Sequence, residues 1–303
     1  MADPALYLTT KELADLIRVR ERKVYDLAAA GEVPFTRVTG KLLFPRHLIE
    51  AWLARHTEVS ADLAALPDPP PVAAGSHDPL LDWALRGSRS DIATMFDGSL
   101  DGLERFADRR ALFCGLHVPE DAQVPEEGRE ALGWNQARVA ARFSAMPVVL
   151  VEWAWRERGL IVQPENPLGI GALSDLAGKR VVPRQAEAGT QHLFRALADR
   201  AGLDAGAVSF APPARSEQDV AVSVLNGHAD AGLGLLSVAR EYRLGFVPLA
   251  RERFDLLVWR RSWFEPAFQT LLAFCRSEAF AARAEELGGY DIRGLGRVRF
   301  NGP

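Results

Sequence analysis

Three apolar segments of the chain each end at a small or hydroxyl residue that begins a helical pattern, and this repetition constrains the fold more than any other feature. The three junctions are Ser76, Gly98-Ser99 and Gly189-Thr190. Strand-like and helical patterns that alternate in this way predict an α/β domain. In open α/β sheets, ligands bind where strand C-termini and helix N-termini converge. We therefore expect a binding cleft lined by these three junctions.

Of the three junctions, the one at Gly189 has the most groups that could bind a ligand. Val181-Val182 predicts a short buried strand, and a helix entered at Gly189-Thr190 has its apolar residues at helical spacing. Unpaired N–H groups at the helix start, the Thr190 hydroxyl and the charge of Arg184 together predict a place for a small anion, which Gly189 would let approach the backbone. The alternative is an ordinary turn in which Thr190 caps its own helix.

Residues 7–56 predict a small separate domain of three helices and a hairpin. Thr9 and Glu12 form a capping box at the start of the first helix, and Glu21 to Ala30 predicts the second. The residues expected to face inward in the three helices are Leu13, Leu16, Ile17, Val24, Leu27, Leu48, Ile49, Trp52 and Leu53.

Phe35 to Pro45 alternates around Thr39-Gly40, which predicts a β-hairpin, and Arg46 to Arg55 predicts the third helix. Several phrases of this segment resemble the excisionase-type winged helix-turn-helix. The resemblance implies that the second helix enters the DNA major groove and that the hairpin contacts the backbone or the minor groove. The resembling phrases are Leu8–Ile17, Val24-Tyr25, Gly31–Pro34, Phe44–Arg46 and Trp52-Leu53, and the DNA-binding residues that they imply are Arg20, Arg22, Lys23, Tyr25, Arg37 and Lys41.

The distribution of charge supports DNA binding at this end of the chain. The net charge of −4 argues against general coating of nucleic acid, but residues 1–57 carry nine Lys and Arg against seven Asp and Glu, whereas the rest carries 27 against 33. The alternative is that the basic residues form only a solvated face. A domain of this size binds double-stranded DNA weakly by itself, so we expect a homodimer.

The sequence predicts an α/β fold made of an N-terminal winged helix-turn-helix head and a two-lobed body like that of type II periplasmic binding proteins. The expected head is residues 1–57 and the expected body is residues 75–303, joined by a Pro-rich linker over residues 58–74. Lobe 1 is expected at about 75–155 and 250–303, and lobe 2 at about 156–249. Within the body we expect separate strands at 147–151, 160–162, 246–249 and 254–259, and one long helix at 267–287.

The assignment of the body depends on a resemblance to the periplasmic-binding-protein-like domain that is fused to helix-turn-helix heads in bacterial regulators. That domain is related to the molybdate and tungstate binding proteins, which implies an oxyanion sensor. The resembling phrases are Gly75–Asp78, Gly98–Leu100, Gly115–His117, Gly159–Val162, Asn166-Pro167, Arg184-Gln185, Gly189-Thr190, Ala229–Gly234 and Phe246–Leu249. The expected ligand-binding residues are Ser76, His77, Ser99, Arg184, Gly189, Thr190, Gln191 and Glu217, with Asp219 as an alternative to Glu217.

One phrase departs from this family. Where the family reads Gly-Ser-Gly-Thr-Arg, the chain has Glu187-Ala188-Gly189-Thr190-Gln191, so a hydroxyl and a guanidinium that bind anions strongly are absent. Side chains that could instead frame a larger organic ligand are His77, His117, His192 and Trp134. The function predicted first is a one-component regulator whose lobes close on a small molecule. The alternative is a DNA-anchored accessory protein with a degenerate cleft.

Other classes of function lack their signatures. Cys114 and Cys275 lie in apolar surroundings, which predicts buried free thiols. His77-Asp78, and His117 with Glu120, do not have the spacing of metal ligands, and no Gly-x-Ser-x-Gly is present. We therefore expect no metal, no cofactor beyond the small-molecule effector, and no enzymatic activity. The chain has no signal sequence and no apolar run of about 18 residues, which predicts a cytoplasmic protein without a membrane partner.

Overall fold

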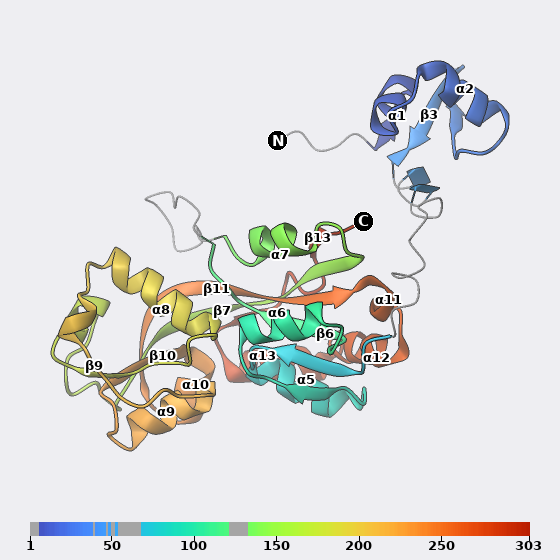
Figure 1. Ribbon diagram of the computed structural model, residues 1–303. Coiled ribbons are helices and arrows are strands. Elements are labelled where there is room, and N and C mark those ends of the chain that lie inside the picture. The colour runs from blue at the N-terminus through green and yellow to red at the C-terminus, as the bar shows by residue number, and fades with distance from the viewer. Residues whose placement is uncertain (1–5, 39, 47, 50–51, 54–67, 121–132) are drawn as a thin grey trace. The chain divides into compact units, whose positions relative to one another are not determined.

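Figure 1 shows the computed structural model of the chain, which divides into two compact units, Met1–Leu66 and Pro67–Pro303. We call the first unit the head and the second the body. The structure describes residues 6–38, 40–46, 48–49, 52–53, 68–120 and 133–303.

The head packs two short helices against a small antiparallel sheet of strand order β1-β3-β2. The capping box is confirmed, because Thr9 Oγ1 accepts from the Glu12 N–H and Glu12 reaches back to the Thr9 N–H. The predicted hairpin is confirmed as β2 and β3. The elements are β1 (Tyr7–Leu8), α1 (Thr10–Leu16), α2 (Glu21–Ala29), β2 (Thr36–Val38) and β3 (Lys41–Pro45), and their core contains Leu8, Leu13, Ala14, Val24, Ala28, Val33, Phe44 and Ile49.

Two residues expected in this core are on the surface. Leu16 is 48% exposed and Leu48 is 40% exposed, so their predicted inward orientation was wrong. Helix α1 is only seven residues long, and it turns Leu13 and Ala14 inward while Leu16 ends it on the solvent side. In the predicted third helix, the described residues Arg46, Leu48, Ile49, Trp52 and Leu53 are helical, whereas 47, 50–51 and 54–55 lie outside the described residues, as does Thr39 of the hairpin.

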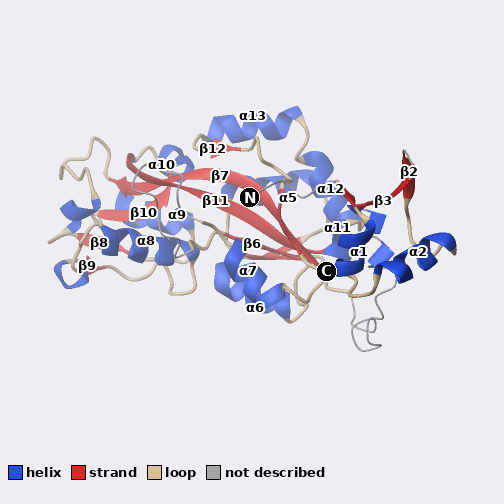
Figure 2. Ribbon diagram, turned by 90° about the horizontal axis from the view of Figure 1, so that it is seen from above, coloured by secondary structure: helices blue, strands red, loops and turns tan. Residues whose placement is uncertain are grey.

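The body is built on one mixed sheet with helices on both faces (Figure 2). Its strand order is β5-β4-β6-β11-β7-β10-β8-β9, and β12 and β13 also pair with β7. The α/β class is therefore confirmed. The strands are β4 (Val72–Gly75), β5 (Ala93–Met95), β6 (Phe113–Leu116), β7 (Val148–Val162), β8 (Arg180–Val182), β9 (Ser209–Phe210), β10 (Ala231–Leu235), β11 (Gly245–Trp259), β12 (Tyr290–Asp291) and β13 (Val298–Asn301).

Two helices begin at the predicted strand-to-helix junctions, α6 at Ser99 and α8 at Gly189. The long terminal helix expected at 267–287 is instead two helices, because the chain turns at Cys275 and Ser277 caps a new start. The helices are α5 (Pro79–Ser88), α6 (Ser99–Ala107), α7 (Gln136–Phe143), α8 (Gly189–Arg200), α9 (Glu217–Leu225), α10 (Leu236–Glu241), α11 (Arg260–Trp263), α12 (Pro266–Phe274) and α13 (Glu278–Leu287), with 3₁₀ turns η1 (Leu173–Leu176) and η2 (Ala205–Ala207).

Strands β7 and β11 are each 15 residues long and run through both halves of the body (Figure 2). They pair antiparallel along their length, with irregularities between Pro248 and Ala250 and between Phe254 and Asp255. The expectation of four short strands was therefore wrong, because the polar residues between them continue the ladder. Lobe 1 is built on β4, β5 and β6 and lobe 2 on β8, β9 and β10, so the chain crosses between the lobes at residues 152–158 and 250–255.

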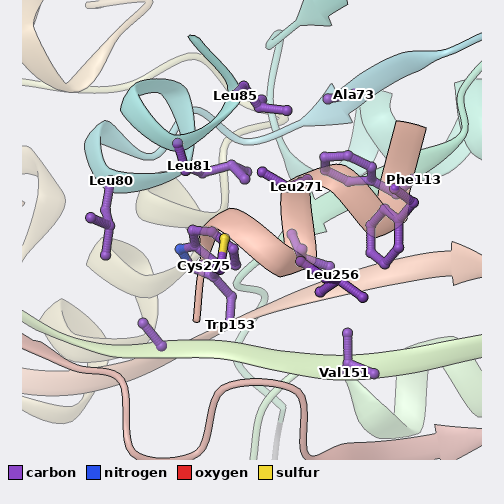
Figure 3. Packing of buried hydrophobic residues seen from close by; sticks show 14 of the residues in the cluster. Ala73, Leu80, Leu81, Leu85, Phe113, Val151, Trp153, Leu256, Leu271 and Cys275 are labelled. Atoms are coloured by element: carbon purple, nitrogen blue, oxygen red, sulfur yellow. The ribbon is translucent and has the colours of Figure 1, made fainter. Parts of the chain in front are cut away.

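Lobe 1 has a large apolar core between α5, α12, α13 and the sheet, part of which Figure 3 shows. Leu81 and Leu85 of α5 belong to this core together with Leu271 of α12, Cys275 at its C-terminal end and Trp153 of β7. Cys114 and Cys275 are buried free thiols, as predicted. The first strand of the lobe begins at Val72, within the range expected for the linker, and residues 58–67 of that range lie outside the described residues.

Candidate functional site

The crossing strands carry a buried ion cluster where lobes 1 and 2 join. Arg156 and Arg158 are two residues apart on β7 and so lie on the same face of the strand, and Glu252 of β11 is opposite Arg156. Glu252 accepts from the guanidiniums of both arginines, at 2.6 Å from Arg158 Nε. Burial alone would raise the pKa of Glu252, but the two arginines hold it well below its usual range, so the carboxylate is ionised.

The cluster continues into lobe 2 through Glu217, the first residue of α9. Arg158 donates two hydrogen bonds to its carboxylate, at 2.7 and 3.0 Å. Arg184, just beyond β8, donates from Nη1 at 2.9 Å, and the Thr190 hydroxyl of α8 donates at 3.0 Å. Burial raises the pKa of Glu217, but Arg158 and Arg184 outweigh it and lower the pKa to about 2. One carboxylate therefore uses four donor groups from three separate segments.

The cluster continues into lobe 1 through Asp78 and His117. Asp78 accepts from Arg156 at 2.9 Å, from Tyr290 at 2.7 Å and from the Leu81 N–H that it caps. His117 Nδ1 lies 2.9 Å from Glu252 Oε2. Burial lowers the pKa of His117 despite the attraction of Glu252, so the ring is neutral at pH 7. Since an ionised carboxylate only accepts, His117 donates through Nδ1.

Two serines stand at the lobe 1 side of the cleft. Ser76 follows β4 and Ser99 begins α6, and their hydroxyl oxygens are 2.8 Å apart and buried. The His117 N–H donates to Ser99 Oγ at 3.3 Å. Hydroxyl groups at the start of a helix are suited to an anion, but in this structure they bind each other and the His117 backbone.

Two hydrogen bonds join the lobes close to these junctions. The Leu100 N–H donates to the Glu187 carbonyl at 3.3 Å, and the Gln185 amide donates to the Asp97 carbonyl at 3.2 Å. A Cβ on Gly189 would lie 2.7 Å from the carbonyl oxygen of His117. In this structure the close neighbour of Gly189 is therefore His117 of lobe 1, and ligand approach to the Gly189 backbone stays a prediction.

The predicted ligand-binding residues thus fall into two groups and one outlier. Ser76 and Ser99 meet on lobe 1, and Arg184, Gly189, Thr190, Gln191 and Glu217 meet on lobe 2, where Gln191 Oε1 accepts from the Arg184 N–H at 2.9 Å. Thr190 does not cap α8, because its hydroxyl donates to Glu217. His77 is half-buried beside Phe96, with 5.7 Å between the ring centroids. Asp219 is exposed and caps α9.

Three members of the cluster, Arg156, Arg158 and Glu252, were not expected from the sequence. The available signal was the spacing of Arg156 and Arg158 by two residues in a strand-like segment, which puts both on one face. Trp153 is buried completely and Trp155 is half-buried. Trp134 also lies in the core, among the apolar residues of lobe 2, so it does not frame the cleft.

A separate cavity of about 420 Å³ opens on lobe 2 beside the cleft. Arg184, Gln185 and Gln191 form its polar edge, and Phe194 and Phe210 are among its apolar walls. Its size and mixed lining are suited to a small organic molecule.

The head presents its candidate DNA-binding residues to solvent. Arg20, Arg22, Lys23 and Tyr25 are exposed at the start of α2, and Arg37 and Lys41 are exposed on the hairpin. In the same helix Val24 and Ala28 are buried, so the basic side chains lie on the face away from the core of the head.

The matches to known families agree with this geometry. Residues 83–276, more than half of the chain, match the model of the PBP superfamily domain. The chain belongs to that superfamily. Residues 7–57, ahead of the PBP domain, match the helix-turn-helix domain family.

Two relatives and two solved structures resemble parts or all of this PBP-superfamily chain. The Bacillus subtilis (strain 168) protein YvgK is 25% identical over 308 residues, covering 96% of each chain. A Clostridium pasteurianum protein encoded in the 5′ region of the ferredoxin 2Fe-2S gene is 31% identical over 80 residues, covering 26% of this chain and 71% of its own. The GluR0 ligand-binding core of Nostoc punctiforme in complex with L-glutamate is 12% identical over 71% of this chain and 98% of its own, with a TM-score of 0.45. The Streptococcus pneumoniae substrate-binding protein AbpA bound to L-arginine is 11% identical over 71% of this chain and 92% of its own, with a TM-score of 0.45.

A helix-turn-helix head and a PBP-superfamily body are the parts of a DNA-binding regulator with a ligand-binding domain. None of the helices in the described part of the chain has the length and apolar character needed to span a bilayer.

Proposed function

We propose that the chain is a cytoplasmic, one-component transcription regulator that senses a small molecule in the cleft of its PBP domain. The ligand proposed first is an oxyanion such as molybdate or tungstate. The observation that carries this proposal is the convergence of Arg158, Arg184 and Thr190 on a single carboxylate position. Charged and hydroxyl donors fixed on separate elements are what a small anion requires.

The proposed mechanism couples the cleft to the DNA. A ligand that binds one arrangement of the lobes more tightly than the other shifts the population between them. In a homodimer, that shift changes the spacing of two heads and hence their fit to two half-sites on double-stranded DNA. The chain acts by binding in this proposal, without metal or catalysis.

A thermal-shift panel on the full chain tests the ligand. A ligand at about 100 times its dissociation constant adds about 2.7 kcal/mol of stability, which raises the melting temperature by several degrees. We expect this rise with molybdate or tungstate. A rise only with an organic acid or base would replace the ligand, and the cavity beside Arg184 would be its proposed place. That result would keep the proposal of a ligand-sensing regulator and reject the oxyanion as its ligand.

A second function is favoured by the contacts between the lobes. Because hydrogen bonds between the lobes and the balanced ion cluster of β7 and β11 already satisfy the polar groups there, the body could serve a DNA-anchored accessory protein as a partner or dimer surface. Absence of any shift across the panel, combined with retained DNA binding, would favour this function over sensing.

Charge reversal in the head tests DNA binding separately. Arg22→Glu is expected to abolish binding to DNA selected from a random pool by the wild-type protein, because it replaces an exposed cation on α2 with an anion. The matched control is Arg276→Glu, which reverses an exposed charge in the body and should leave DNA binding unchanged. Unchanged binding by Arg22→Glu would show that the DNA-contacting helix is placed wrongly.

A further inference from the structure

The anion position of lobe 2 is occupied by a group of the chain itself. The carboxylate of Glu217 accepts two hydrogen bonds from Arg158, one from Arg184 and one from Thr190. The Glu217 residue is 1% exposed, and the interacting side chains of the two arginines are at most 7% exposed. A carboxylate held in this way makes the contacts that a bound oxyanion would make.

The charge around this position is already balanced. The connected cluster contains three guanidiniums and three carboxylates, and the neutral His117 adds no charge. The members are Arg156, Arg158, Arg184, Asp78, Glu217 and Glu252. A second anion placed beside Glu217 would therefore meet a carboxylate without any uncompensated cation, in a buried site where such repulsion is strong.

The start of α9 does not depend on the side chain of Glu217. The start of α9 is held by Ser216 and Asp219, which cap each other's backbone N–H groups, and this capping does not involve the Glu217 side chain. Rotation about the side-chain bonds of Glu217 moves the carboxylate while the backbone stays in place.

We propose that Glu217 is a tethered occupant of the anion site and that an oxyanion binds there only by displacing its carboxylate. This rests on the proposed function, since it concerns the same cleft, and it makes Glu217 the residue that sets the affinity for anions. The affinity of the wild-type protein is reduced in proportion to the fraction of time that the site is vacated.

The test is anion binding by full-length Glu217→Gln and Glu217→Ala, measured by isothermal titration at pH 7.5 with molybdate and with sulfate. Both substitutions remove the competing negative charge. The cluster is then left with one more guanidinium than carboxylates, and Arg158 and Arg184 have lost their shared partner. We expect dissociation constants at least about tenfold lower than for the wild-type protein. The matched control is Glu152→Gln, which removes a buried carboxylate paired with Arg299 outside this cluster and should leave the anion affinity unchanged.

A second measurement shows where the anion binds. In the Glu217→Ala background, Arg184→Gln should abolish the gain in affinity. The melting temperature of Glu217→Ala should also rise with acetate or sulfate in a saturable manner, because the added anion replaces the missing carboxylate. If Glu217→Ala is unfolded without anions, refolding by sulfate or molybdate supports the proposal, and failure of every anion to restore the fold overturns it.

The outcomes separate this inference from the proposed function. Folded variants that bind molybdate and sulfate no more tightly than the wild-type protein overturn the inference, even if the wild-type protein binds molybdate well. A wild-type protein that binds neither anion, together with variants that bind them, supports the inference and removes the oxyanion as the physiological ligand.

Discussion

In the head, Arg22, Lys23 and Lys41 are exposed to solvent, whereas in the body Arg156 and Arg158 are completely buried among carboxylates. An exposed cation keeps its hydration and is available to a phosphate. A buried cation has lost its hydration and depends on partners inside the chain. The comparison teaches that burial decides the role of a basic residue. An exposed one can bind an outside partner, whereas a buried one stabilises the fold through partners in the chain.

The largest expected effect comes from removing a buried cation. Arg158→Met leaves Glu217 and Glu252 without their shared partner, so we expect a loss of about 3–5 kcal/mol in the free energy of unfolding, measured by urea denaturation. Arg22→Met in the head is the matched control and should change it by less than about 0.5 kcal/mol. Equal stability of the two variants would break the comparison between head and body.

Acid should reveal the next largest effect. The pKa of Glu217 is about 2 in the folded chain, against an ordinary value of 4.5. Because the folded pKa is the lower one, its stabilisation is fully present above about pH 4.5 and is lost as the pH falls toward 2. The shift corresponds to about 3 kcal/mol. Denaturation of wild-type protein and Glu217→Gln between pH 5 and pH 2.5 should give stabilities that converge, and parallel curves would contradict the assigned ionisation.

A smaller effect is expected where the lobes touch. Gly189→Ala places a Cβ against the His117 carbonyl, so we expect the closed form to lose about 1–3 kcal/mol. Gly171→Ala is the control, since the nearest atom to its Cβ would be 3.7 Å away. Thermal denaturation compares the two. A harmless Gly189→Ala would mean that lobe contact contributes little to stability.

The smallest effect on stability is expected in the hairpin of the head, where only DNA binding should change. Lys41→Ala removes one exposed cation, so affinity should fall similarly for all sequences and the magnitude of the salt slope, log K against log salt, should fall by about one. The free energy of unfolding should stay within about 0.5 kcal/mol. Fluorescence anisotropy at several salt concentrations measures the slope, and an unchanged slope would remove Lys41 from the DNA-binding surface.

Much of the secondary structure could be predicted because its signals are local. The capping box at Thr9, the hairpin around Gly40 and the helix starts at Ser99 and Gly189 each depend on residues close together in the chain. The long strands β7 and β11 were not predicted, because their middle is polar and reads as a break between apolar runs. Burial of that polar middle depends on both lobes being present.

The candidate site was predicted in part for the same reason. Arg184, Thr190 and Glu217 were expected near one another from a resemblance and from their junctions, and they do meet. That Glu217 occupies the position of the anion could not be inferred, because it depends on Arg158 reaching across from a strand 59 residues away in sequence.

The sequence by itself determined the two-part organisation, the α/β class, the exposed basic surface of the head and the strand-to-helix junctions of the body. These follow from periodicity, capping and local charge. The tertiary structure alone decided which buried charges neutralise which, because Asp78, Arg156, Glu217 and Glu252 come from four separate elements. Desolvation forces each buried charge to find an opposite one, and only the packing of the lobes determines where that partner lies.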